Sequence, residues 1–129
     1  MKNFMHLNAA SLESAFRTLR KEGAQAIAGG RDLLTMLKGG ILAPALVVNL
    51  KTIPGLDTVR FDESAGLTMG ALATLGALSR DPAVQEKYPM LRMAISAAAS
   101  PQLRNMGTIG GNLFQHPRCW YYRGPFPCW

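Results

Sequence analysis

The stretch Ile27-Ala28-Gly29-Gly30-Arg31-Asp32-Leu33-Leu34 decides the fold class, because an apolar run meets two glycines there and a helical pattern begins at once. Before it, residues 24–28 form a short run of small residues that is typical of a buried strand. After it, apolar residues recur at helical spacing until Gly39-Gly40 ends the pattern. A strand that runs through glycines directly into a helix predicts a parallel α/β unit.

The flanking segments extend this unit on both sides. Residues 4–9 alternate between two faces, as a short strand does, and Ser11 is a suitable cap for an amphipathic helix that ends at Gly23. Residues 45–50 are a continuous apolar run of strand type. Residues 1–53 are therefore expected to form a first subdomain in the order strand, helix, strand, helix, strand.

A second subdomain is expected over residues 54–129, with the boundary between residues 51 and 56. Two segments of alternating pattern predict an antiparallel hairpin: residues 56–62 and 67–72. The following helix starts are marked by a capping residue or a proline: Thr74, Asp81-Pro82 and Pro89. These helices are predicted to end near Ser100-Pro101. The expected fold is thus α+β, a small parallel unit followed by an incomplete mixed sheet with helices.

Composition excludes several classes of protein. The chain has 129 residues, 48% of them hydrophobic and 17% charged, with a formal net charge of +6. This is enough for one domain with its own core and argues against a disordered tail, a disulfide-rich miniprotein and a multidomain enzyme. The apolar stretches are too short to cross a bilayer, and the first residues lack the pattern of a secretory signal. A cytoplasmic chain without membrane insertion is expected.

The glycine loop after the second predicted strand has the features of an anion site. Gly29 and Gly30 leave backbone N–H groups open to a ligand, and Arg31 adds a charged donor beside the start of a helix. Phosphate is the ligand that such a loop favours. A tight turn without a ligand is the alternative, and the spacing matches neither a Rossmann GxGxxG motif nor a Walker loop.

A second glycine-rich stretch, residues 104–112, follows the last predicted helix and is expected to be a loop. Its glycines allow close approach of the backbone, while Thr108 and Asn112 offer a hydroxyl and an amide to a phosphate, a ribose or the edge of a heterocycle. A plain surface loop is the alternative, although neighbouring apolar residues such as Ile109 indicate an anchor in a core.

The last part of the chain concentrates unusual residues. Between residues 101 and 129 there are arginines but no acidic residue, and both cysteines, Cys119 and Cys128, lie there. The two thiols can be metal ligands, free thiols or a disulfide pair. Interleaved arginines and aromatics are compatible with nucleic-acid binding, but no recognised motif accompanies them, and no nucleic-acid partner is expected. Neither His6 nor His116 has neighbours at metal-site spacing, and no catalytic side chain is assigned.

Six ordered segments together resemble the FAD-binding medium subunit of xanthine dehydrogenase-type molybdenum hydroxylases, over nearly the whole chain: residues 28–34, 48–50, 53–54, 67–71, 101–105 and 108–112. The resemblance implies a two-subdomain FAD-binding fold of the vanillyl-alcohol-oxidase/PCMH type, with the FAD pyrophosphate between the two glycine-rich stretches. The implied FAD contacts are Ile27, Ala28, Gly29, Gly30, Arg31, Asp32, Leu33 and Leu34 on one side and Thr108, Ile109, Gly110, Gly111 and Asn112 on the other. The family usually has threonine or serine where Arg31 stands, so a charged group replaces one hydroxyl contact.

The tail is similar to one branch of this family, that of 4-hydroxybenzoyl-CoA reductase and related aldehyde oxidoreductases, which inserts a [4Fe-4S]-binding loop here. That resemblance makes Cys119 and Cys128 candidate ligands of a cluster, although a cluster normally takes four thiolates and the set is incomplete. The implied partners are a large subunit with the molybdenum cofactor and a small [2Fe-2S] subunit. The implied activity is electron relay through FAD between the iron-sulfur centres and an external acceptor or donor.

Two hypotheses about the chain stay open. It is either a flavin-bearing oxidoreductase subunit that has been cut short, or a truncated non-enzymatic remnant or anion-binding module that does not hold flavin alone. The ending Pro127-Cys128-Trp129 favours truncation, because an aromatic residue and a thiol are normally followed by something to pack against. Export to the periplasm together with a partner subunit is the alternative to the cytoplasm.

Overall fold

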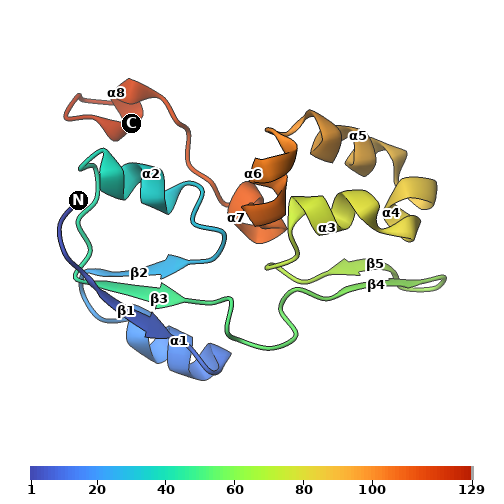
Figure 1. Ribbon diagram of the computed structural model, residues 1–129, viewed down its shortest axis with the longest axis horizontal. Helices are drawn as coiled ribbons and strands as arrows, with labels where there is room; N and C mark the ends of the chain where they lie inside the picture. Colours follow the sequence, from blue (N-terminus) through green and yellow to red (C-terminus); the bar gives the residue numbers. More distant parts are fainter. Residues whose placement is uncertain (129) are drawn as a thin grey trace.

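A three-stranded parallel sheet forms the first part of the computed structural model, which describes residues 1–128 (Figure 1). Its strands lie in the order β1-β3-β2 and alternate along the chain with two helices. These elements are β1 (Met5–Asn8), α1 (Leu12–Leu19), β2 (Ala24–Ile27), α2 (Leu33–Lys38) and β3 (Leu46–Asn49). The predicted parallel unit of alternating strands and helices is confirmed.

The central strand β3 explains why the two helices cover opposite faces of this sheet. Successive side chains of a strand point to opposite faces, and Val47 and Val48 are both almost completely buried. Val47 packs in a cluster with Leu37 of α2, whereas Val48 packs in a cluster with Ala15 of α1. A strand covered on both faces needs a continuous apolar run, which is the pattern that the sequence shows there.

The first helix begins where the sequence predicts it. The Ser11 hydroxyl accepts a hydrogen bond from the backbone N–H of Ser14, and the Ser14 hydroxyl accepts one from the N–H of Ser11. This reciprocal pair is a capping box. Gly23, with a φ of 72°, then reverses the chain into β2.

An antiparallel hairpin and the helices packed on it form the second part of the fold. The elements are β4 (Val59–Asp62), β5 (Gly66–Met69), α3 (Leu75–Arg80), α4 (Pro82–Lys87) and α5 (Pro89–Ala97). The side chains of Thr74 and Asp81 cap α3 and α4 at the predicted starts. The core of this part consists of Ala73, Leu75, Leu78, Val84, Ile95 and Ile109.

The prediction that the helices end near Ser100-Pro101 is wrong. Three short helices follow that point: α6 (Pro101–Met106), α7 (Ile109–Leu113) and α8 (Trp120–Arg123). The Ser100 hydroxyl caps α6 by accepting from the N–H of Leu103, and the Thr108 hydroxyl caps α7 by accepting from the N–H of Gly111. Capping and tertiary contacts override the low helix propensity of glycine, so the stretch expected to be a loop is helical on both sides of Gly107.

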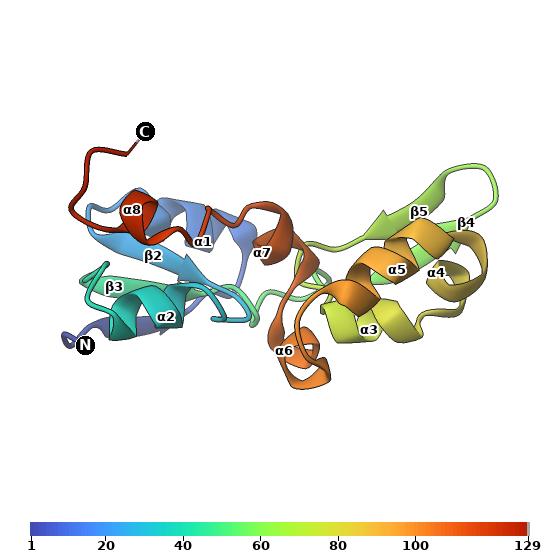
Figure 2. The ribbon, with the colours of Figure 1, turned by 90° about the horizontal axis from the view of Figure 1, so that it is seen from above.

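The two sheets lie side by side, and α6 and α7 lie between them (Figures 1 and 2). After α7 the chain returns to the first sheet, where α8 lies beside α2 in Figure 1. A hydrogen bond between Arg123 of α8 and Asp32 at the start of α2 holds these two segments together. Within residues 1–128, no helix combines the length and the apolar character that a bilayer crossing requires.

Candidate functional site

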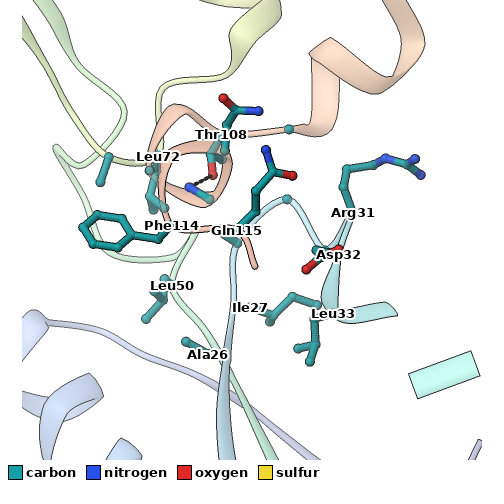
Figure 3. Close-up of a pocket in the computed structure, with 18 of the residues that line it drawn as sticks. Ala26, Ile27, Arg31, Asp32, Leu33, Leu50, Leu72, Thr108, Phe114 and Gln115 are labelled. Atoms are coloured by element: carbon teal, nitrogen blue, oxygen red, sulfur yellow. Dashed lines mark hydrogen bonds between the residues drawn. The ribbon is translucent and has the colours of Figure 1, made fainter. Parts of the chain in front are cut away.

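A pocket of about 560 Å³ opens between the two parts of the fold, beyond the carboxyl ends of β2 and β3 (Figure 3). It is lined by the loop between β2 and α2, by the α6–α7 region and by the segment that follows α7. Ligands of α/β proteins usually bind beyond the carboxyl ends of parallel strands. The volume falls within the range of pockets that hold cofactors and other small molecules.

The loop between β2 and α2 offers a set of free backbone donors. Gly30 has a φ of 69°, a conformation that other residues rarely adopt. Within residues 1–128, the backbone N–H groups of Gly29, Gly30, Arg31 and Asp32 donate no hydrogen bond. Because unsatisfied donors gathered at one place favour an acceptor-rich ligand, this loop is suited to bind an anion.

Two glycines of the glycine-rich stretches lie directly against neighbouring main chain. A Cβ atom on Gly29 would collide with the carbonyl oxygen of Met106. A Cβ atom on Gly110 would lie 2.8 Å from the carbonyl oxygen of Ala71. At both positions the lack of a side chain therefore allows main chain to pack on main chain, and at Gly29 this contact joins the two glycine-rich stretches.

Backbone donors of the second stretch are mostly used within the protein. The N–H of Gly110 donates to the carbonyl of Ala71, and the N–H of Gly111 donates to the Thr108 hydroxyl. Thr108 is 3% exposed, and within residues 1–128 its hydroxyl hydrogen has no acceptor. The second stretch thus contributes a side-chain donor to the pocket, whereas the first contributes backbone donors.

The segment after α7 lies over the loop between β2 and α2, called here the first loop, and two of its arginine side chains pair with that loop. Nη2 of Arg123 lies 2.9 Å from Oδ2 of Asp32, and Nε of Arg118 lies 3.3 Å from Oδ1. Arg123 also donates to the carbonyls of His116 and Pro117, so it holds the turn of this segment as well. Arg118 is more than half exposed, whereas the side chain of Arg123 is 9% exposed.

One oxygen of the Asp32 carboxylate remains without a hydrogen bond. Oδ1 is buried and receives no hydrogen bond within residues 1–128, although Nε of Arg118 lies 3.3 Å from it. A buried carboxylate oxygen that lacks a donor is rare in folded proteins and is well placed to accept one from a ligand.

The pocket has an apolar side that faces away from Asp32. Leu50, Leu72 and Phe114 lie there, and Gln115 lies between them and Asp32 (Figure 3). Phe114 is 87% exposed, so a flat ring could cover an aromatic face that is now open to solvent.

The pocket contains most of the site residues that the sequence predicts: Ile27, Ala28, Gly29, Gly30, Arg31, Asp32, Leu33, Thr108, Gly110, Gly111 and Asn112. Leu34 does not line it and instead borders a smaller pocket with Arg31 and Lys38 on the other side of the loop. Ile109 does not line it either, because its side chain is buried in the core of the second part of the fold, called here the second core.

Sequence reasoning missed several residues that line the pocket: Leu50, Leu72, Ala99, Phe114, Gln115 and Arg118. Leu50 directly follows β3, so the rule that ligands lie beyond the carboxyl ends of parallel strands could have found it. The others reach the pocket through tertiary folding, and no local pattern marks them.

Both cysteines lie outside the pocket. Cys119 and Cys128 are exposed free thiols. In the described part of the chain, no group of three or more histidine, cysteine, aspartate or glutamate side chains is arranged to hold a metal ion.

Two solved structures resemble this chain closely. Carbon monoxide dehydrogenase from Hydrogenophaga pseudoflava, in a form that lacks the Mo-pyranopterin moiety, matches with a TM-score of 0.81 and 32% identity over 87% of this chain and 39% of that one. Quinoline 2-oxidoreductase from Pseudomonas putida 86 matches with a TM-score of 0.80 and 32% identity over 88% of this chain and 40% of that one. The predicted mixed fold of helices and strands is thereby confirmed.

Curated proteins with similar sequences carry flavin-binding names. The chain is 38% identical over 117 residues to the aldehyde oxidoreductase FAD-binding subunit PaoB of Escherichia coli K12, which covers 90% of this chain and 36% of that protein. It is 35% identical over 116 residues to the nicotinate dehydrogenase FAD-subunit of Eubacterium barkeri, which covers 88% of this chain and 39% of that protein. This chain therefore spans less than two fifths of these relatives. Residues 2–118 match the family described as the FAD binding domain in molybdopterin dehydrogenase, and the chain belongs to that family.

Proposed function

We propose that this chain binds FAD in the pocket between its two sheets, as part of the flavin-bearing medium subunit of a molybdenum hydroxylase complex. Membership of the family supports the identity of the cofactor. The observation that carries the proposal is the row of free backbone N–H groups at residues 29–32, which opens onto a pocket of about 560 Å³.

The charges around the first loop fit a pyrophosphate. Arg118 and Arg123 pair with a single carboxylate, that of Asp32, and Arg31 also lines the pocket, so the loop keeps a positive surplus. Arginine binds phosphate oxygens well because its planar N–H groups match their geometry. With Asp32 paired to two arginines, its negative charge no longer opposes an anion at the neighbouring N–H groups.

The remaining groups of the pocket fit the other parts of FAD. Oδ1 of Asp32 can accept a hydrogen bond from a sugar or ribityl hydroxyl, and the Thr108 hydroxyl can donate one to a phosphate or carbonyl oxygen. The apolar side at Leu50, Leu72 and Phe114 offers a surface for a flat ring system. The residues present therefore fit the cofactor that the family binds.

We further propose that residues 1–53 and 54–129 are two halves of a FAD-binding fold of the vanillyl-alcohol-oxidase/PCMH type. The parallel sheet in the first half and the hairpin with helices in the second support this division, as does the position of the pocket between them. All contacts implied for the pyrophosphate come from the loop of the first half and the Thr108 region of the second.

In the proposed complex this chain binds and orients FAD, and no side chain of its own acts as nucleophile, acid or base. FAD, when bound, supplies electron and hydride transfer. The expected partners are a large subunit with the molybdenum cofactor and a small [2Fe-2S] subunit. A 37% identical relative is named the medium chain of carbon monoxide dehydrogenase from Hydrogenophaga pseudoflava, which supports a chain that is one of several. The complex would work in the cytoplasm, or in the periplasm if exported as a whole.

The two cysteines do not by themselves fit a [4Fe-4S] cluster. Cys119 and Cys128 supply two thiols, and within residues 1–128 they belong to no group of three or more histidine, cysteine, aspartate or glutamate side chains that could hold a metal ion. A cluster takes four ligands, so these residues could serve as ligands only together with others from a longer chain. No step of the proposed function depends on them.

The decisive test is retention of FAD by the purified chain. The chain is incubated with FAD, desalted and examined for a bound flavin spectrum and quenched flavin fluorescence, with FMN and ADP as competitors. The proposal is supported if the chain retains FAD and if FMN and ADP each reduce that retention. Flavin that washes away completely would leave the second hypothesis, a remnant or anion-binding module that does not hold flavin alone.

A pair of glycine variants ties binding to the loop. Gly30→Val and Gly55→Val both place a branched side chain at a positive φ, of 69° and 78°, so they carry similar backbone strain. Gly30 lines the pocket and Gly55 does not. Loss of FAD from the Gly30 variant alone is the expected result, and equal loss from both would contradict the assignment of the loop.

A further inference from the structure

We infer that Arg104 is a positioning residue of the flavin pocket: its guanidinium holds the turn between α5 and α6 in the shape that makes Ala99 part of the pocket wall. This inference rests on the proposed function and deepens it. It names the residue that sets one wall of the site without touching the ligand.

A single nitrogen of Arg104 donates hydrogen bonds to three carbonyl oxygens at the end of α5. Nη1 lies 2.8 Å from the carbonyl oxygen of Ala99 and 3.2 Å from those of Ser96 and Ala98. The last carbonyls of a helix have no partner within the helix, so a positive donor there satisfies groups that would otherwise need water. Arg104 therefore fixes the path of the chain as it leaves α5.

Ala99 is held in a conformation that alanine does not favour. Its φ is 54°, and within residues 1–128 it is the one residue other than glycine with a positive φ. The left-handed region is unfavourable for a residue with a Cβ atom, so the surroundings must compensate for it. The shortest of the three contacts of Arg104 is made to the carbonyl of this same residue.

The turn matters for the pocket because of what lies on each side of it. Ala99 and Leu103 line the pocket, whereas Arg104 does not. Ala98 packs on the second core, and α6 ends at Met106, against which Gly29 of the first loop packs. A relaxed turn would move both the wall at Ala99 and the helix that contacts the first loop.

The test compares substitutions at two arginines in the purified chain of residues 1–129. Arg104→Met removes the donors and keeps much of the apolar stem, and Arg104→Lys keeps one charged nitrogen that can donate to several carbonyls. Arg92→Met is the matched control, because Arg92 is exposed on α5 and its side chain makes no hydrogen bond within residues 1–128. The readouts are the Kd for FAD, the visible circular dichroism of bound flavin and the Tm of the protein without FAD.

We expect Arg104→Met to weaken FAD binding by about tenfold or more, since it removes hydrogen bonds from a charged donor. Arg104→Lys should retain more of the affinity, and Arg92→Met should bind FAD as the wild-type chain does. An unchanged Kd and flavin dichroism in a folded Arg104→Met variant would overturn the inference and leave the proposed function intact. Absence of FAD binding by the wild-type chain would overturn both.

A second substitution tests whether Arg104 acts through the turn. Glycine adopts a positive φ without strain, so Ala99→Gly should restore most of the FAD affinity and the flavin dichroism in the Arg104→Met background. A merely structural loss, spread over the fold, would not be repaired at that one position. If the double variant binds FAD no better than Arg104→Met, Arg104 does not act through Ala99 and the inference is wrong.

Discussion

Nη2 of Arg123 lies 2.9 Å from Oδ2 of Asp32, although 91 residues separate the two in the chain. The contact joins the segment after α7 to the loop that carries the free backbone donors. The Arg123 side chain is 9% exposed and that of Asp32 is 24% exposed, so the pair is largely shielded from water and salt. It fixes one wall of the pocket to the residues that we propose bind pyrophosphate.

Replacing Arg123 by methionine should lower both stability and FAD affinity. The substitution removes a charge-assisted hydrogen bond and leaves a partly buried carboxylate with one partner fewer, which costs about 1.5 to 3 kcal/mol. Urea unfolding and FAD titration measure the two effects. Arg118→Met is the comparison, because the Arg118 side chain is 57% exposed and its loss should change stability by less than about 1 kcal/mol. Equal losses from both variants would contradict the structural role given to Arg123.

Replacing Gly29 by alanine should separate the two glycine-rich stretches. The new methyl group would collide with the Met106 carbonyl oxygen, and overpacking of this kind costs about 1 to 3 kcal/mol. We expect a lower free energy of unfolding and weaker FAD binding. Gly39→Ala is the control, because a Cβ atom there lies 3.3 Å from its nearest neighbour and the φ is −76°. A Gly29→Ala variant as stable as the control would show that the main chains are not in contact.

Substituting each of two capping threonines separates the loss of helix stability from the loss of a contact to the ligand. Thr108 and Thr74 each accept a hydrogen bond from a backbone N–H at the start of a helix, and Thr108 lines the pocket while Thr74 does not. Valine at either position should cost about 1 kcal/mol of stability through the lost cap. The Kd for FAD should rise in Thr108→Val alone. A similar rise in Thr74→Val would mean that destabilisation, and not the hydroxyl, weakens binding.

The turn of the β4–β5 hairpin should respond to acid. Hydrogen bonds from the Ser64 hydroxyl and from the backbone N–H groups of Ala65 and Ser64 lower the pKa of Asp62 from its ordinary value of 3.8. Since the pKa is lower in the folded chain, the ionised carboxylate favours the folded turn above the ordinary pKa, and this contribution is lost as the pH falls through the folded value. The amide NMR signals of Ser64 and Ala65 should therefore titrate with a midpoint below 3.8. Asp62→Asn should abolish that titration, and a midpoint at or above 3.8 would contradict the hydrogen bonds.

The parallel unit could be predicted from the sequence because its signals are local. The apolar run at residues 45–50 and the glycines at positions 23, 29 and 30 mark the strand and the turns without help from the rest of the fold. The region after residue 100 could not be predicted equally well, because glycines hid α7 although Thr108 caps it. A threonine three residues before a glycine is a weaker signal than the glycines themselves.

The glycine loops of the candidate site were visible in the sequence, whereas its walls were not. Arg118 and Arg123 looked like a basic tail, and their common partner, Asp32, lies in a different part of the chain. The residues around Ala99 in the sequence give no sign of its left-handed conformation, because that conformation depends on contacts that Arg104 makes after folding. Residue pairs of this kind follow from tertiary structure, and a single sequence holds no pattern for them.

Because Gly29 has no side chain, the distance between the two main chains at this point is set by their direct contact. Because backbone touches backbone between Gly29 and Met106, no rotamer change can widen or narrow the cleft at that point. Changes of ligand preference must then come from the rim, where exposed side chains such as Phe114 and Gln115 can vary without moving either sheet. The width of the cleft and the chemistry of its walls are thus set by different residues and are free to evolve separately.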